Sequence, residues 1–158
     1  MPSRRRLRVK FILPALTEAT SPYWRPIKYS LFPPLGLATL AAYLEPDDDA
    51  VIVDEHVAPL DTDDPPDLVA IQVYITNARR AYALADTYRA KGVFVALGGL
   101  HVTSLPDEAA PHADTIFLGR ASRYFRSFST TFDWAVHSAG TRPRRGGPSI
   151  ACRRSAAI

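Results

Sequence analysis

Cysteine is nearly absent from this sequence of 158 residues, in which Cys152 is the only one. One thiol excludes an internal disulfide, and it also excludes a zinc site or an iron–sulfur cluster built from cysteines of this chain alone. Such a composition is typical of a cytoplasmic protein. The sequence also lacks any run of about 20 apolar residues, so no membrane-spanning helix is expected.

The central part of the chain lacks excess positive charge, although the net charge is +3. Residues 1–10 hold five Arg or Lys, and residues 119–158 hold eight Arg and one Asp, so these two ends contribute +5 and +7. Residues 11–118 therefore carry −9. Because a phosphate-binding surface needs its positive charge on the folded part, we predict no nucleic-acid partner.

Glycine-rich phosphate-binding loops are missing as well. The stretch PALTEATSPYW at 14–24, which follows the first apolar run, contains no glycine. This excludes a G-x-G-x-x-G dinucleotide site or a P-loop at that position. The chain also has no G-x-S-x-G motif of a serine hydrolase and no Asp at the end of IQVYITN, where a phosphoacceptor would stand.

Short apolar runs bounded by turn residues are what the sequence does contain. They are rich in Val, Ile and Phe and barely alternate with polar residues, which is typical of strands buried on both faces of a parallel sheet. The five runs are RVKFIL at 8–13, AVIV at 50–53, LVAIQV at 68–73, VFVAL at 93–97 and TIFL at 115–118.

Helical patterns lie between these runs. In the stretch 76–92, Thr76 or Asn77 is expected to cap a helix and Gly92 to end it. One face of this helix should pack on the sheet, because apolar residues recur there at helical spacing. The residues of that face are Ala81, Leu84, Ala85 and Tyr88. Further helices are expected over 34–44, 105–111 and 122–136.

Alternating strands and helices predict an open, doubly wound α/β domain of the flavodoxin-like (Rossmann-like) type, with five parallel strands in the order 2-1-3-4-5. Ligands of such folds bind beyond the carboxyl ends of the strands. Three segments follow strand ends there: 14–33, YITN at 74–77 and GGLHVTS at 98–104. The first is long for a strand-to-helix loop, which usually takes about 2–6 residues, and this length indicates a functional segment.

These residues resemble the cobalamin-binding domain that precedes the catalytic barrel in cobalamin-dependent radical S-adenosylmethionine proteins. The resemblance covers about residues 7–119 in the order of that family. The matching stretches are FPPLGLATLAAYL, VDE after the second strand, DLVAIQV, ARRAYALADTYRAKG, VALGGLHVTSLPDEA and ADTIFLG.

The resemblance implies that cobalamin is the cofactor and lies over the strand ends, with its nucleotide tail in the crevice. Carried over by position, residues 74–76 flank the tail or the corrin ring, residues 98–100 allow close approach of the backbone, and the loop 14–33 covers one face of the ring. The predicted cofactor-binding residues are Thr17, Tyr74, Ile75, Thr76, Gly98, Gly99, Leu100, His101 and Gly119.

No histidine is predicted to bind cobalt. The stretch DEHVAP at 54–59 is similar to the Asp-x-His-x-x-Gly motif of cobalamin mutases, but it follows the second strand and has Pro59 in place of the glycine. We therefore expect His56 to lie in a solvated loop. His101 matches a histidine of the resembled family, and we expect it to orient its loop.

The chain also departs from the resembled family. That family continues Gly-Glu-x-Glu after the fifth strand, whereas this chain has GRAS at 119–122. The C-x-x-x-C-x-x-C motif that holds the iron–sulfur cluster is absent, so we predict no radical chemistry and no catalysis by this chain alone. It is expected to be a stand-alone carrier or a truncated product, with a separate radical S-adenosylmethionine or methyltransferase protein as the candidate partner.

Two alternatives stay open. The domain, expected to span residues 1–136, could be a small α/β enzyme or a nucleotide-sugar-binding domain, for which His101 is the one obvious acid or base. It could also be a degenerate remnant that binds nothing, as Arg120 in place of an acid suggests. Residues 137–158, rich in Arg, Gly and Pro, are expected to form a disordered tail.

Overall fold

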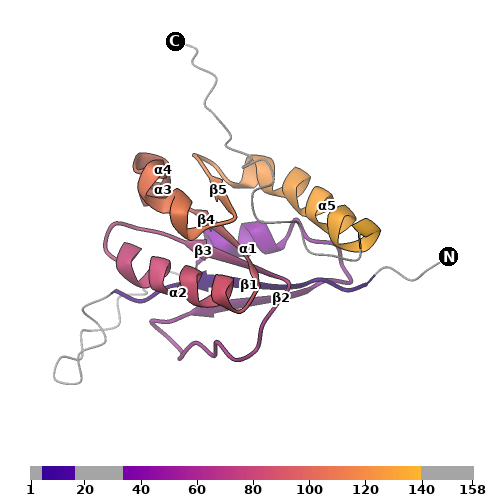
Figure 1. Ribbon diagram of the computed structural model, residues 1–158, viewed down its shortest axis with the longest axis horizontal. Coiled ribbons are helices and arrows are strands. Elements are labelled where there is room, and N and C mark those ends of the chain that lie inside the picture. The colour runs from indigo at the N-terminus through magenta and orange to yellow at the C-terminus, as the bar shows by residue number, and fades with distance from the viewer. Residues whose placement is uncertain (1–4, 17–33, 140–158) are drawn as a thin grey trace, which may run out of the picture.

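A five-stranded parallel sheet forms the centre of the computed structural model, which describes residues 5–16 and 34–139 (Figure 1). The strand order is β2-β1-β3-β4-β5. This confirms the predicted flavodoxin-like arrangement. The strands are β1 (Arg8–Leu13), β2 (Asp49–Asp54), β3 (Leu68–Gln72), β4 (Phe94–Gly98) and β5 (Thr115–Phe117).

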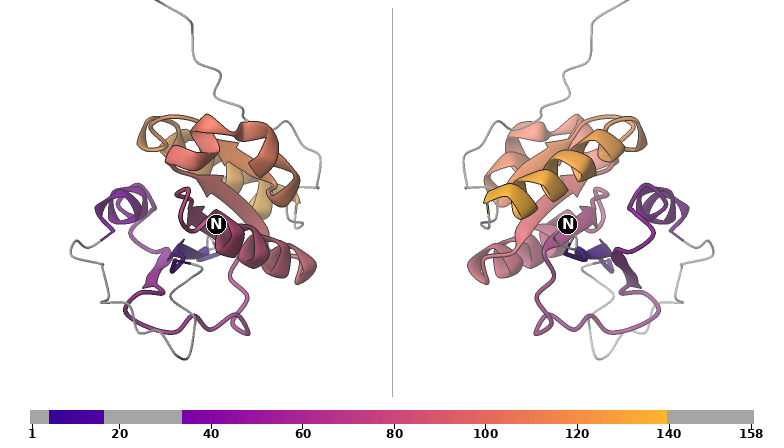
Figure 2. Two further views of the ribbon diagram at one scale, coloured as in Figure 1. Left: turned by 90° about the vertical axis from the view of Figure 1, so that its left-hand side faces the viewer. Right: turned by 90° about the vertical axis from the view of Figure 1, so that its right-hand side faces the viewer.

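Helices cover both faces of the sheet, with α2 on one side and α1 on the other (Figure 2). The helices are α1 (Leu35–Ala41), α2 (Ala78–Ala90), α3 (Leu100–Ser104), α4 (Pro106–Ala109), the 3₁₀-helix η2 (Ala110–His112) and α5 (Ser122–Ala139). Within the ranges 5–16 and 34–139, none of the helices is both long and apolar enough to cross a membrane.

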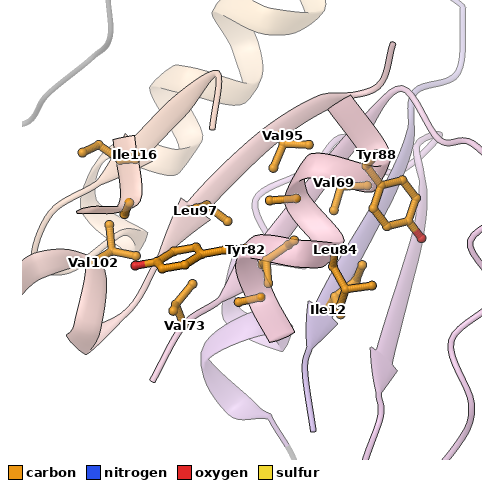
Figure 3. Close-up of a cluster of buried hydrophobic side chains, with 14 of the residues drawn as sticks. Ile12, Val69, Val73, Tyr82, Leu84, Tyr88, Val95, Leu97, Val102 and Ile116 are labelled. Carbon is orange, nitrogen blue, oxygen red and sulfur yellow. The ribbon is translucent and has the colours of Figure 1, made fainter. Parts of the chain in front are cut away.

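One hydrophobic core lies between the sheet and α2, and Figure 3 shows its side chains. The predicted stripe Ala81, Leu84, Ala85 and Tyr88 is buried there, as expected for the face of a helix that packs on a sheet. The strands contribute branched residues to this face, namely Ile12, Val69, Ile71, Val73, Val95, Leu97 and Ile116. Gly92 has a positive φ of 76° and follows the end of α2, which confirms its predicted role.

A second core lies on the other face, beneath α1 and α5. Phenylalanine dominates it: Phe125, Phe128 and Phe132 of α5 pack against one another and against the sheet, with ring centroids 5–6 Å apart. Val9, Leu68 and Phe94, near the amino-terminal ends of their strands, add further bulk together with Phe11 in the middle of β1. This leaves the carboxyl-terminal halves of β3 and β4 less filled on this face.

Two expectations from the sequence were wrong in detail, and one helix was missed. Strand β2 is not buried on both faces: it lies at one edge of the sheet, and Val51 and Ile52 are 45% and 39% exposed. Helix α1 ends at Ala41, not at residue 44. Helix α3 was not expected, because its five residues are too few to show a helical period.

The predicted division of the chain falls partly outside the described residues. Helix α5 runs to Ala139, past the expected boundary at 136, and residues 140–158 of the expected tail are not among those described. The same holds for residues 17–33 of the long loop, including Thr17.

Candidate functional site

The exits of β3 and β4 are bound tightly to each other at the carboxyl edge of the sheet. Val73 donates its N–H to the carbonyl of Gly98 at 2.8 Å, and its own carbonyl accepts the N–H of His101 at 3.3 Å. The turn between β4 and α3 is therefore pressed against the backbone that follows β3.

Gly99 makes this close approach possible. Its φ is +120°, a conformation that L side chains rarely adopt, and a Cβ placed on it would lie 2.5 Å from the carbonyl oxygen of Val73. The sequence predicted that glycines here let a ligand approach the backbone, whereas in the structure the group that approaches Gly99 is the backbone of Val73. Gly98, by contrast, has room for a Cβ at ordinary contact distance from Phe117.

A cavity of about 260 Å³ lies on the α1 and α5 face of the sheet and reaches the strand ends. Its floor is made by small residues: Ala70 and Ala96 are paired in register, and Gly98 is paired with Gln72. On the opposite face the same two strands present Val69, Ile71, Val95 and Leu97. The space therefore follows from an alternation of large and small side chains along β3 and β4.

Both helices contribute walls to this cavity. Gly36, Leu37, Thr39 and Leu40 of α1 line one side, and Gly119, Arg120, Ala121, Ser122 and Phe125 line the other. Gln72 brings an amide into it, which donates to the hydroxyl of Tyr74 at 2.6 Å. The walls are mainly apolar, with a few polar groups, as is common in sites for small organic ligands.

Apolar side chains are exposed beside the strand ends. Tyr74, Ile75 and Leu100 are 41%, 79% and 71% exposed; the first two lie in the loop that follows β3, and Leu100 begins α3 just after β4. Since large apolar side chains are seldom exposed together without a reason, they indicate a surface that receives a ligand or a partner.

The structure places most of the predicted cofactor-binding residues in this region. Gly98, Gly99 and Gly119 line the cavity. Tyr74, Ile75, Thr76 and Leu100 are exposed next to the strand ends. Thr17 lies outside the described residues, so its role stays a prediction.

His101 lies apart from the cavity lining. Its imidazole is buried, and its Nε2 lies 3.1 Å from Oε1 of Glu108. This hydrogen bond holds the pKa of the Glu108 carboxyl below its ordinary value. The contact ties α3 to α4, which agrees with an orienting role for His101.

Tyr82 packs beside this pair, with its ring stacked on His112 at a centroid distance of 4.5 Å. Burial, with the nearby Glu108 carboxylate, raises the pKa of Tyr82 to about 12. This cluster belongs to the α2 side of the sheet, away from the cavity.

His56 is bound to its neighbour Asp54. Oδ1 of Asp54 accepts the backbone N–H of His56 at 2.9 Å and lies 2.8 Å from its Nδ1. The side chain is only 14% exposed, so the expectation of a solvated histidine was wrong. Among the described residues, no group of three or more His, Cys, Asp or Glu could hold a metal ion.

Several residues of the cavity were not found from the sequence. Gly36, Ala70, Gln72 and Ala96 carry no motif of their own. The available signal was the pair of small residues two apart on β4, Ala96 and Gly98, which share one face of the sheet with Ala70 of β3. That signal becomes readable only when the opposite face is known to hold large residues.

Comparisons with known proteins identify a family that this chain matches. The model of the B12 binding domain matches residues 29–128. Bacteriochlorophyllide d C-8(2)-methyltransferase of Chlorobaculum tepidum is 40% identical over 88 residues, which cover 55% of this chain and 20% of that protein. Bacteriochlorophyllide d C-12(1)-methyltransferase of the same organism is 42% identical over 53 residues, 34% of this chain and 12% of that protein. The chain thus spans a small part of either relative.

Proposed function

This chain belongs to the B12 binding domain family, and we propose that it holds cobalamin with the nucleotide tail in the cavity beneath α1 and α5. Cobalamin is the cofactor that the family match supports, and the resemblance seen in the sequence is thereby confirmed at the level of the family. The observation on which the proposal rests is the set of small residues that opens one face of an otherwise filled sheet at its carboxyl edge.

The residues of the cavity fit the tail of a corrinoid. Its walls of Ala, Leu, Gly and Phe suit a flat aromatic base, because apolar surface removed from water stabilises binding. Arg120 is the one cation among the described residues that line the cavity, and the tail contains an anionic phosphodiester.

The exposed edge fits the macrocycle. Tyr74, Ile75 and Leu100 offer apolar contact beside the opening of the sheet, and a large ring covering them would remove their surface from water. The proposed role of these residues is to support the ring and to exclude water from it.

The chemistry that cobalamin supplies when bound is transfer of a group, such as methyl, that cobalt carries. The residues of this chain would bind and orient the cofactor, and a single cysteine cannot hold a cluster of its own. Because both relatives are named methyltransferases, we propose methyl transfer as the reaction served, together with a catalytic radical S-adenosylmethionine or methyltransferase unit.

A role as a small enzyme of another class has less support. His101, the one obvious acid or base, is buried against Glu108 and does not line the cavity. A catalytic group must come within hydrogen-bond reach of its substrate, and the cavity gives His101 no such access.

The proposal is tested by titrating the full chain with hydroxocobalamin, followed by visible absorbance and calorimetry. We expect saturable binding of one corrinoid. Gly98→Leu should weaken it at least tenfold, because the new side chain fills the cavity without a backbone conflict.

Ala83→Leu is the matched control, since it places the same side chain at an exposed position of α2 on the opposite face. This variant should bind like the wild type. Absence of binding by the folded wild-type chain would overturn the proposal, and equal effects of the two variants would overturn the assignment of the cavity.

A further inference from the structure

One peptide group at the exit of β1 is held at both of its polar atoms by buried side chains. The carbonyl of Pro14 accepts a hydrogen bond from Nδ2 of Asn77 at 3.0 Å. The N–H of Ala15, on the other side of the same peptide bond, donates to Oε2 of Glu55 at 3.1 Å. The orientation of this peptide plane is therefore fixed from two directions.

The two side chains come from different parts of the carboxyl edge. Asn77 directly precedes α2, and Glu55 directly follows β2. Asn77 also accepts the N–H of Tyr74 on its Oδ1 at 2.8 Å, so one amide connects the exit of β1 with the exit of β3. Glu55 is bound in turn by Arg80 of α2, at 2.6 and 3.2 Å.

This arrangement is more than the fold needs in order to end its strands. Strand ends at the edge of a sheet can leave their polar groups to water. Here Asn77 is only 2% exposed and the Glu55 side chain only 8%. Burying an amide and a carboxylate is unfavourable unless their partners are complete, and a complete buried network imposes one geometry.

The geometry that it imposes is that of the candidate site. Tyr74 is held at its N–H by Asn77 and at its hydroxyl by Gln72, whose amide lines the cavity. A tyrosine that is 41% exposed would otherwise be free to adopt several positions. Its position is thus set before any ligand arrives, which reduces the entropy lost on binding.

We propose that Asn77 and Glu55 are positioning residues of the corrinoid site, forming a clamp that fixes the exits of β1 and β3 relative to each other. They act through the Pro14–Ala15 peptide and through Tyr74 and do not themselves touch the ligand. The inference rests on the proposed function for its effect on binding, whereas the clamp itself can be measured without a ligand.

Amide hydrogen exchange in the free, full-length chain is the first measurement. Asn77→Ala should raise exchange at Tyr74 at least tenfold, because the acceptor of its N–H is lost. Glu55→Gln should raise exchange at Ala15, since the charged acceptor becomes neutral. Should Asn77→Ala not fold, Asn77→Leu replaces it, because leucine has a similar size and neither a donor for Pro14 nor an acceptor for Tyr74.

Asp67→Ala is the matched control. Asp67 is a buried polar residue at the opposite, amino edge of the sheet, and its Oδ2 accepts the N–H of Arg8 at 3.1 Å. This change should destabilise the fold but leave the local exchange at Tyr74 and Ala15 as it is in the wild type, once corrected for global unfolding.

Affinity for hydroxocobalamin is the second measurement, made where every variant is folded. We expect at least tenfold weaker binding for the Asn77 variant and less than a twofold change for Asp67→Ala. Equal losses of affinity in these two variants would overturn the positioning role. Unchanged exchange at Tyr74 in the Asn77 variant would overturn the clamp, whether or not the wild type binds a corrinoid. Absence of corrinoid binding by the wild type would contradict only the proposed function.

Discussion

Alanine at position 99 should destabilise the fold through the backbone alone. Gly99 has φ +120° and ψ −178°, a region that is almost closed to other residues, and occupying it costs about 1–3 kcal/mol. The added Cβ would lie 2.5 Å from the carbonyl oxygen of Val73, and relieving such an overlap costs about 1–3 kcal/mol more. The expected loss for Gly99→Ala is therefore about 2–6 kcal/mol of the free energy of unfolding.

Urea unfolding followed by circular dichroism measures this loss, with Gly98→Ala as the control. At Gly98 the nearest atom to a new Cβ is Cβ of Phe117 at 3.5 Å, an ordinary contact, so we expect a change below about 1 kcal/mol. The two variants differ by one position and carry the same added methyl group. A Gly99→Ala protein as stable as Gly98→Ala would refute the backbone argument.

Three further predictions concern stability. Burial raises the pKa of Tyr88 to about 12. The free energy of unfolding should therefore fall as the pH rises from about 10 to 12, because the unfolded chain releases this proton in that range and the folded chain keeps it. In an alkaline titration, Tyr88→Phe should lose that part of the pH dependence. The hydrogen bond from His101 keeps the pKa of Glu108 below its ordinary value of 4.5. The stabilisation from this hydrogen bond is present above pH 4.5 and is lost as the pH falls through the lowered pKa. Acid unfolding of Glu108→Gln should therefore depend less steeply on pH than that of the wild type. Phe125→Ala should cost about 3–5 kcal/mol in urea unfolding, because this fully buried ring packs against three others, and a cost below 1 kcal/mol would contradict the described packing.

The strands and their order could be predicted because the relevant information is local. Apolar runs such as LVAIQV mark buried strands by composition alone, and the crossover rules then leave few topologies. The exposure of β2 could not be read in the same way, because an edge strand of Val and Ile has the composition of a central one. The edge position alone does not decide exposure either, because β5 lies at the other edge and is buried. What decides it is how far the rest of the chain covers the faces of each strand, which is a property of the assembled domain.

The candidate site was predictable where a residue has a conformational role of its own. Gly98 and Gly99 stood out because two glycines after a strand are uncommon, whereas Ala70 and Ala96 did not, because alanine is ordinary in a strand. Asn77 was recognised only as a possible helix cap. In the structure its side chain makes no cap hydrogen bond and binds the exits of two strands, which are 63 and three residues away in the chain.

The strand order also has a consequence for how the protein is made. Strand β1 leaves the ribosome first, but both of its neighbours come later: β2 pairs with it from Asp49 and β3 from Leu68. The nascent chain must therefore keep Val9, Phe11 and Ile12 without their final partners until β3 has been synthesised. Because parallel pairing requires these distant segments to meet, we expect the pairing of β1 with β3 to be the slow step of folding. Before that step the apolar residues of β1 are exposed and can be bound by chaperones.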